Sequence, residues 1–93
     1  MKYSIIIATF NRLEELKELI ASVRAFDFPK DGFELVISDD GSRDGTGEYL
    51  QAQSFDFPFQ YLFQENKGPG EARNHGMRQA RGDYFLFIDS DCI

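Results

Sequence analysis

Short apolar runs alternate with amphipathic segments along the whole chain. Each apolar run is rich in β-branched or aromatic residues and is apolar on both faces, which is typical of strands buried in a parallel sheet. The runs cover Tyr3–Ala8, Phe33–Ser38, Phe59–Gln64 and Asp83–Ile88. The pattern therefore predicts four strands with helical segments between them.

The segments between the strands have the spacing and the end signals of helices. The first follows Asn11, which can cap it, and its apolar residues fall on one side. These are Leu13, Leu16, Leu19, Ile20 and Val23. The second runs from Asp44, as its cap, to about Gln53. The third runs from about Pro69 to Arg81, with Gly82 as its C-terminal cap.

Strands that alternate with helices imply right-handed βαβ crossovers. We therefore predict an α/β fold of the Rossmann-like kind, with three layers (α/β/α) and a mainly parallel sheet. The crossover rule and the two most apolar runs place the second strand beside the first, and the fourth strand on the first strand's other side.

Composition narrows the class of protein. The chain has 93 residues, of which 42% are hydrophobic, so it can bury one modest core. A net charge of −6 disfavours binding to nucleic acid or to an anionic membrane. The lone cysteine, Cys92, excludes an internal disulfide, and no signal sequence or membrane span is evident at the N-terminus. We expect a cytoplasmic protein, with membrane association of a longer parent left open.

Polar residues follow each predicted strand, at the end where parallel α/β sheets bind ligands. They are Thr9 and Asn11, Asp39 and Asp40, Asn66–Gly70, and Asp89 with Asp91. Two carboxylates 4 Å apart repel by about 4 kcal/mol at an effective dielectric constant of 20, so such a cluster calls for a cation or raised pKa values. Oxygen ligands of this kind favour Mg or Mn, which typically bridge to phosphate oxygens.

Three segments together resemble the signature segments of the family 2 glycosyltransferases. They read YSIIIATFNR, ELVISDDGSRDGT and NKGPGEARNHGMRQARGDYFLFIDSD, in that order, and they cover nearly the whole chain. The resemblance implies the GT-A fold and an enzyme that transfers a sugar from a nucleotide-diphosphate sugar to an acceptor, such as a glycan or a lipid-linked acceptor.

The resemblance also implies roles for particular residues. Asp40 would accept a hydrogen bond from the nucleobase, with Asp39 supporting the same loop. Four residues at the end of the first strand would line the nucleotide pocket: Ala8, Thr9, Asn11 and Arg12. Asp89 and Asp91 match the DxD motif, in which Asp89 would contact the ribose and Asp91 would hold a Mn or Mg ion on the diphosphate.

Arg73 and His75 lie on the third predicted helix. Ala72, Gly76 and Ala80 form a stripe of small residues that lets this helix lie close to the sheet. Arg73 projects near the stripe in the first turn, where it can pair with Asp40 or Asp89 or contact the nucleotide. We expect His75, the only histidine, to be a surface residue.

Two other functions compete with this reading. The FIDSDCI segment also resembles the strand-end D-x-D of haloacid-dehalogenase-like phosphatases, although that motif normally opens a domain. A non-catalytic nucleotide- or dinucleotide-binding module is the other alternative, but the glycine fingerprint expected after the first strand is missing.

Family members continue beyond the DxD motif, where the acceptor pocket and the catalytic base lie. We therefore expect residues 1–93 to be the N-terminal, nucleotide-binding portion of a larger catalytic domain, with no catalytic base of its own. We also expect the flank of the fourth strand to be open to self-association.

Overall fold

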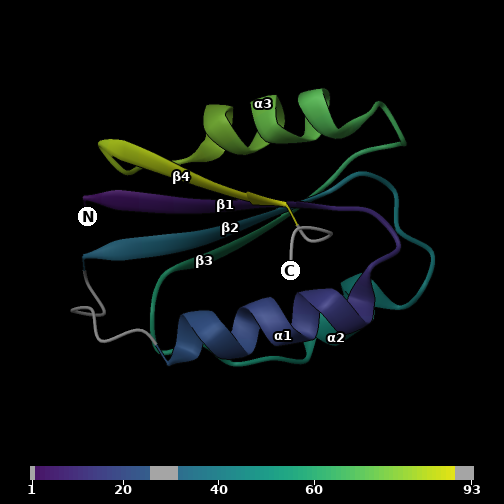
Figure 1. Ribbon diagram of the computed structural model, residues 1–93, viewed down its shortest axis with the longest axis horizontal. Coiled ribbons are helices and arrows are strands. Elements are labelled where there is room, and N and C mark those ends of the chain that lie inside the picture. The colour runs from purple at the N-terminus through teal and green to yellow at the C-terminus, as the bar shows by residue number, and fades with distance from the viewer. Residues whose placement is uncertain (1, 26–31, 90–93) are drawn as a thin grey trace.

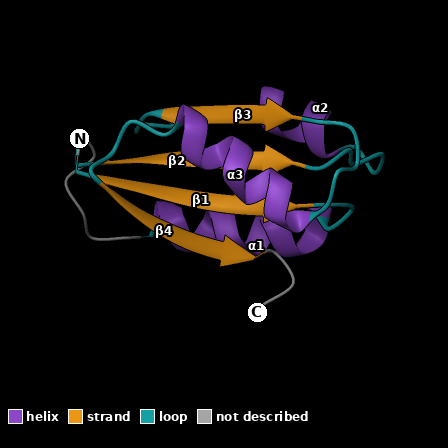
Figure 2. Cartoon of the chain, turned by 90° about the horizontal axis from the view of Figure 1, so that it is seen from above, coloured by secondary structure: helices purple, strands orange, loops and turns teal. Residues whose placement is uncertain are grey.

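The computed structural model describes residues 2–25 and 32–89. Its strands form one parallel sheet in the order β3-β2-β1-β4 (Figures 1 and 2). The strands are β1 (Tyr3–Thr9), β2 (Phe33–Asp39), β3 (Phe59–Phe63) and β4 (Tyr84–Asp89). The helices are α1 (Leu13–Arg24), α2 (Thr46–Gln51) and α3 (Pro69–Gln79).

The elements make three layers. Figure 1 shows α3 on one face of the sheet and α1 with α2 on the other. The predicted α/β/α architecture is confirmed, and so is the placement of β2 and β4 on either side of β1. Each described helix is too short or too polar to cross a membrane.

The larger core lies between the sheet and α1 with α2. It consists of buried side chains that alternate along the strands and recur on one side of the helices. These are Ile5, Ile7, Leu16, Ile20, Val23, Phe33, Leu35, Ile37, Leu50 and Phe57. This core fixes the carboxyl ends of β1 and β2 relative to each other, and those ends carry the candidate site.

The opposite face of the sheet accepts α3 at close range. Ala72 is fully buried, and a Cβ atom added to Gly76 would lie 2.6 Å from Cγ2 of Ile6. The small-residue stripe therefore acts as predicted for these two residues, because any larger side chain at Gly76 would push α3 off the sheet.

A buried carboxylate joins several elements at the amino end of the sheet. Glu34 on β2 accepts hydrogen bonds from Oγ of Ser4 at 2.6 Å, from Nε2 of Gln60 at 3.0 Å and from the backbone N–H of Arg81. Ser4 Oγ in turn accepts from the backbone N–H of Gly82 at 2.8 Å. The network ties β1, β2 and β3 to the turn between α3 and β4.

Three predicted helix caps are wrong. The N-cap residue of α2 is Gly45 and not Asp44, although Oδ1 of Asp44 accepts from the N–H of Thr46 at 3.3 Å. Asn11 does not cap α1, since its backbone is left-handed (φ 53°) and the N-cap residue is Arg12. Gly82 does not end α3, which stops at an extended Ala80. Gly82 instead packs against the backbone of β1, where an added Cβ atom would lie 2.7 Å from the Ser4 nitrogen.

β4 forms one edge of the sheet and is covered less than the other strands. Four successive apolar side chains on it are 38–58% exposed: Tyr84, Phe85, Leu86 and Phe87. Because side chains alternate along a strand, the exposed residues lie on both faces. Figure 2 shows β4 as the last strand at one edge of the sheet.

Candidate functional site

The site forms at the carboxyl ends of the strands. In the parallel register Thr9 pairs with Asp39, and Ala8 pairs with both Ser38 and Asp89. The sheet thus brings the end of β1, the end of β2 and the backbone of Asp89 to one rim, as the sequence predicted. Ala8 and Thr9 are buried there, whereas Asn11 and Arg12 in the next loop are exposed.

Asp40 is the most firmly held carboxylate of this rim. It is only 4% exposed, and its backbone N–H donates to the carbonyl of Thr9 at 2.9 Å. Its Oδ1 accepts from Nε2 of Gln64 at 2.8 Å and from the N–H of Lys67 at 2.7 Å. Its Oδ2 accepts from the N–H of Gly68 at 2.9 Å.

These contacts decide the charge of Asp40. Burial acts to raise its pKa, but the hydrogen bonds from Gln64, Lys67 and Gly68 outweigh burial and leave the pKa below its usual value. A carboxylate has about four acceptor positions. The ionised Asp40 therefore keeps room for one further donor.

Asp39 supports the loop that follows β2. Its Oδ1 accepts from the N–H of Ser42 at 2.9 Å, and its Oδ2 accepts from the hydroxyl of Tyr61 at 2.7 Å. Burial, the hydrogen bond to Asp39 and the negative charge of Asp39 all raise the pKa of Tyr61. Tyr61 consequently remains a protonated donor, and each carboxylate oxygen of Asp39 is engaged inside the protein.

Two loops that line the rim are fastened to each other. The N–H of Asn11 donates to Oγ of Ser42 at 2.7 Å, and Oδ1 of Asn11 accepts from the N–H of Arg43 at 2.8 Å. Oδ2 of Asp44 accepts from the N–H of Leu13 at 3.0 Å. These contacts hold the β1–α1 loop against the β2–α2 loop.

Thr9 brings an unused polar atom to the rim. It is 3% exposed, and its Oγ1 has no hydrogen-bond partner within the part of the chain that the structure describes. Leaving a buried hydroxyl without a partner costs about 1–3 kcal/mol.

Of the two residues of the predicted DxD motif, only Asp89 lies in the described part of the chain. Asp91 falls outside the described residues, and Asp89 is placed by its backbone alone. Within residues 2–25 and 32–89, no group of three or more His, Cys, Asp or Glu side chains gathers in a way that could hold a metal ion. Arg73 is partly buried on α3.

Sequence reasoning missed three residues that shape the site. The sequence pattern places Gln64 and Tyr61 in a strand and indicates no role for either of them or for Ser42. The structure shows that Gln64 holds Asp40 and that Tyr61 and Ser42 hold Asp39. The available signal was the polar Gln64 directly after β3, next to the rim.

Comparison with known proteins agrees with the fold and the motif order. The model of "Glycosyl transferase family 2" matches residues 4–93. The chain is 38% identical to the poly(ribitol-phosphate) beta-N-acetylglucosaminyltransferase TarS of Staphylococcus aureus, covering 98% of this chain and 16% of TarS. It is 39% identical to a GalNAc(5)-diNAcBac-PP-undecaprenol beta-1,3-glucosyltransferase of Campylobacter jejuni, covering 97% of this chain and 29% of that enzyme.

Solved structures show the same architecture. A crystal structure of S. aureus TarS in complex with UDP superimposes with a TM-score of 0.90 at 38% identity, covering 98% of this chain and 28% of that one. A mannosyltransferase from Pyrobaculum calidifontis, in complex with GDP-Man and Mn²⁺, gives a TM-score of 0.90 at 26% identity, covering 97% and 27%.

These neighbours have the GT-A fold, so the predicted fold is confirmed. The chain spans less than a third of the length of these relatives. The matching family consists of glycosyltransferases. The two alternative functions, a phosphatase and a nucleotide- or dinucleotide-binding module, therefore lose their support. The chain belongs to the family 2 glycosyltransferases.

Proposed function

We propose that this chain is the donor-binding part of a glycosyltransferase that moves a sugar from a nucleotide-diphosphate sugar to an acceptor, such as a glycan or a lipid-linked acceptor. The observation that carries the proposal is the buried, ionised Asp40, which is fixed by three donors and keeps one acceptor position. Family membership and the UDP, UDP-GlcNAc and GDP-Man complexes of similar structures support it.

Different residues of the rim contact different parts of the nucleotide-sugar donor. The remaining acceptor position of Asp40 fits an N–H group on the edge of the nucleobase. Four residues at the end of β1 and in the following loop line the nucleotide pocket: Ala8, Thr9, Asn11 and Arg12. Arg73 contributes positive charge beside the same rim, and Asp39 acts by holding the loop around Ser42.

The divalent ion is assigned to the end of β4. Asp91 would ligate Mn or Mg, since carboxylate oxygens suit these ions. Asp89 would contact the ribose. When bound, such an ion neutralises the charge of the diphosphate. The Mn²⁺ complex of the Pyrobaculum mannosyltransferase supports a divalent ion of this kind.

Sugar transfer also needs a base within reach of the acceptor hydroxyl. Asp39 and Asp40 are both committed to hydrogen bonds inside the rim. We therefore propose that the base and the acceptor pocket come from a larger catalytic domain, of which residues 1–93 form the N-terminal portion. The cytoplasmic location stays a prediction.

Calorimetry with UDP and GDP, each with and without Mn²⁺, tests the donor site directly. We expect binding that Mn²⁺ strengthens, and we expect Asp91→Asn to abolish that dependence. Failure of both nucleotides to bind the chain, with and without metal, would contradict the proposal. In an assay for released nucleoside diphosphate, acceptor-dependent turnover by the 93-residue chain would show that the chain needs no further domain.

We also propose that the isolated chain associates with itself through β4. The exposed apolar side chains of Tyr84, Phe85, Leu86 and Phe87 support this, because an uncovered edge strand can pair with a second chain.

A further inference from the structure

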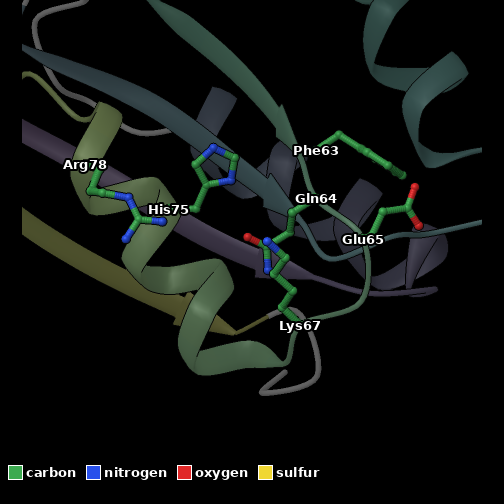
Figure 3. A pocket seen from close by; sticks show the side chains of 6 residues that line it. All are labelled: Phe63, Gln64, Glu65, Lys67, His75 and Arg78. Carbon is green, nitrogen blue, oxygen red and sulfur yellow. The ribbon is translucent and has the colours of Figure 1, made fainter.

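A shallow hollow of about 340 Å³ lies where the end of β3 faces α3. Its lining comes from two parts of the chain, the end of β3 with the loop after it and the middle of α3 (Figure 3). The residues are Phe63, Gln64, Glu65, Lys67, His75 and Arg78. The volume falls at the lower end of the range for small-molecule sites.

The hollow lies in a basic stretch of an acidic chain. Residues 67–81 carry four basic side chains and one acidic side chain, whereas the whole chain has 16 acidic and 10 basic residues. Of these basic residues, Lys67 and Arg78 line the hollow. Glu65 also lines the hollow, so its charged lining residues are two basic and one acidic. The charge of the hollow is still opposite in sign to the net charge of the chain, and it attracts anions.

Neither cation forms an ion pair with a carboxylate of the described residues. Among residues 2–25 and 32–89, no carboxylate lies within ion-pair distance of Lys67 or Arg78. Glu65 turns toward Phe63 and away from Lys67 and His75 in Figure 3. An anion in the hollow would meet two charged donors without competition from an internal salt bridge.

His75 adds a third polar group. His75 lies at the surface of the hollow, but its side chain is partly buried and its Nδ1 is enclosed. That atom has no hydrogen-bond partner among the described residues. Each ring nitrogen of a histidine can take part in a hydrogen bond, and Nδ1 is the enclosed one. Nε2 is not among the enclosed atoms, so this nitrogen can serve as a donor to a bound anion.

We propose that this hollow binds a phosphate group, free or esterified, at a site beside the Asp40 rim and distinct from the nucleotide pocket proposed above. Lys67 supplies a point charge, Arg78 offers a planar pair of N–H donors and His75 offers one more. Several donors that approach from two elements suit an anion with several oxygens. The half-exposed Phe63 provides an apolar wall for the remainder of an esterified ligand.

The hollow shares two residues with the support of Asp40. The side chain of Gln64 and the backbone N–H of Lys67 both donate to Oδ1 of Asp40. A phosphate group that orders Lys67 therefore also orders the loop that holds Asp40.

NMR offers a direct test, because His75 is the only histidine and its ring resonances need no further assignment. The 93-residue chain is titrated at low ionic strength with inorganic phosphate and, separately, with glycerol phosphate. We expect saturable shifts of the His75 ring. Saturation by glycerol phosphate as well shows that the site accepts an ester, and saturation by inorganic phosphate alone restricts it to the free ion.

Variants separate a site from general charge attraction. Lys67→Gln and Arg78→Gln should each weaken binding about fivefold or more, since each removes a charge-assisted hydrogen bond. Lys17→Gln on α1 makes the same change in net charge elsewhere and should alter the affinity by less than about twofold. Absence of saturation, or an equal loss in Lys17→Gln, would overturn the proposal.

Discussion

The carboxylate of Asp44 caps helix α1 from another loop, because its Oδ2 accepts a hydrogen bond from the backbone N–H of Leu13 at 3.0 Å. Its Oδ1 also accepts from the hydroxyl of Thr46 at 2.6 Å, next to the start of α2. One side chain therefore serves the first turns of two helices and joins the loops around the candidate site.

Asp44→Ala should lower the free energy of unfolding by about 1–2 kcal/mol, which is the range for loss of a helix cap. Urea denaturation followed by circular dichroism measures this. Glu18→Ala, an exposed acidic residue on α1, is the control and should change stability by less than about 0.5 kcal/mol. Equal effects of the two substitutions would show that the contact with Leu13 contributes nothing.

Stability should fall in acid partly through Glu34. Burial acts to raise its pKa, but the hydrogen bonds from Arg81, Ser4 and Gln60, with the charge of Arg81, leave the pKa below its usual value. A carboxylate whose pKa is lower in the folded state stabilises the protein above the unfolded pKa, and that contribution is lost as the pH falls through the folded pKa.

Glu34→Gln should therefore be less stable at pH 7, by about 1–3 kcal/mol, because the amide cannot accept from all three donors. Its stability should also change less than that of the parent chain between pH 5 and about pH 3. Thermal melts at a series of pH values give both quantities. Parallel stability curves for the two proteins would contradict the assignment.

Gly76→Ala should destabilise the chain by about 1–2 kcal/mol. The new Cβ atom would lie 2.6 Å from Ile6, and this overpacking exceeds the gain in helix propensity of about 1 kcal/mol. Gly70→Ala on the same helix is a matched control, since nothing lies within 4 Å of its added Cβ atom. The control should be neutral or slightly stabilising, and the reverse order of the two variants would contradict the close packing of α3.

Asp40→Asn should weaken UDP binding about tenfold, with or without Mn²⁺, because an amide cannot offer the same acceptor to the nucleobase and meets the N–H groups of Lys67 and Gly68 less favourably. Calorimetry measures the affinity. Asp83→Asn makes the same chemical change at an exposed position before β4 and should leave it unchanged. Unaltered UDP affinity in Asp40→Asn would remove Asp40 from the donor site.

Self-association of the isolated chain should depend on β4. Replacing Leu86, which is 46% exposed, by Lys should shift the chain toward the monomer in sedimentation velocity, since a charge on an edge strand opposes pairing. Phe63→Lys on the opposite edge strand is the control, as Phe63 is 49% exposed. A chain that is monomeric at all concentrations would disprove the proposed contact.

The sequence by itself determined the elements and their order. Apolar runs such as Ile5–Ile7 can only be buried on both faces, and the crossover rule then leaves few arrangements of four parallel strands. The close approach of α3 was also evident from the sequence, because the spacing of Ala72 and Gly76 is a local property of a helix.

Only the tertiary structure decided which groups meet at the rim and at the amino end of the sheet. The donors to Asp40 come from 24 to 28 residues away, and Arg81 lies 47 residues from Glu34. Asn11 had the right type and place to cap α1, but its left-handed backbone turned it toward Arg43 and left the cap to Asp44. Such partners depend on strand register and loop path, which local patterns of residues do not encode.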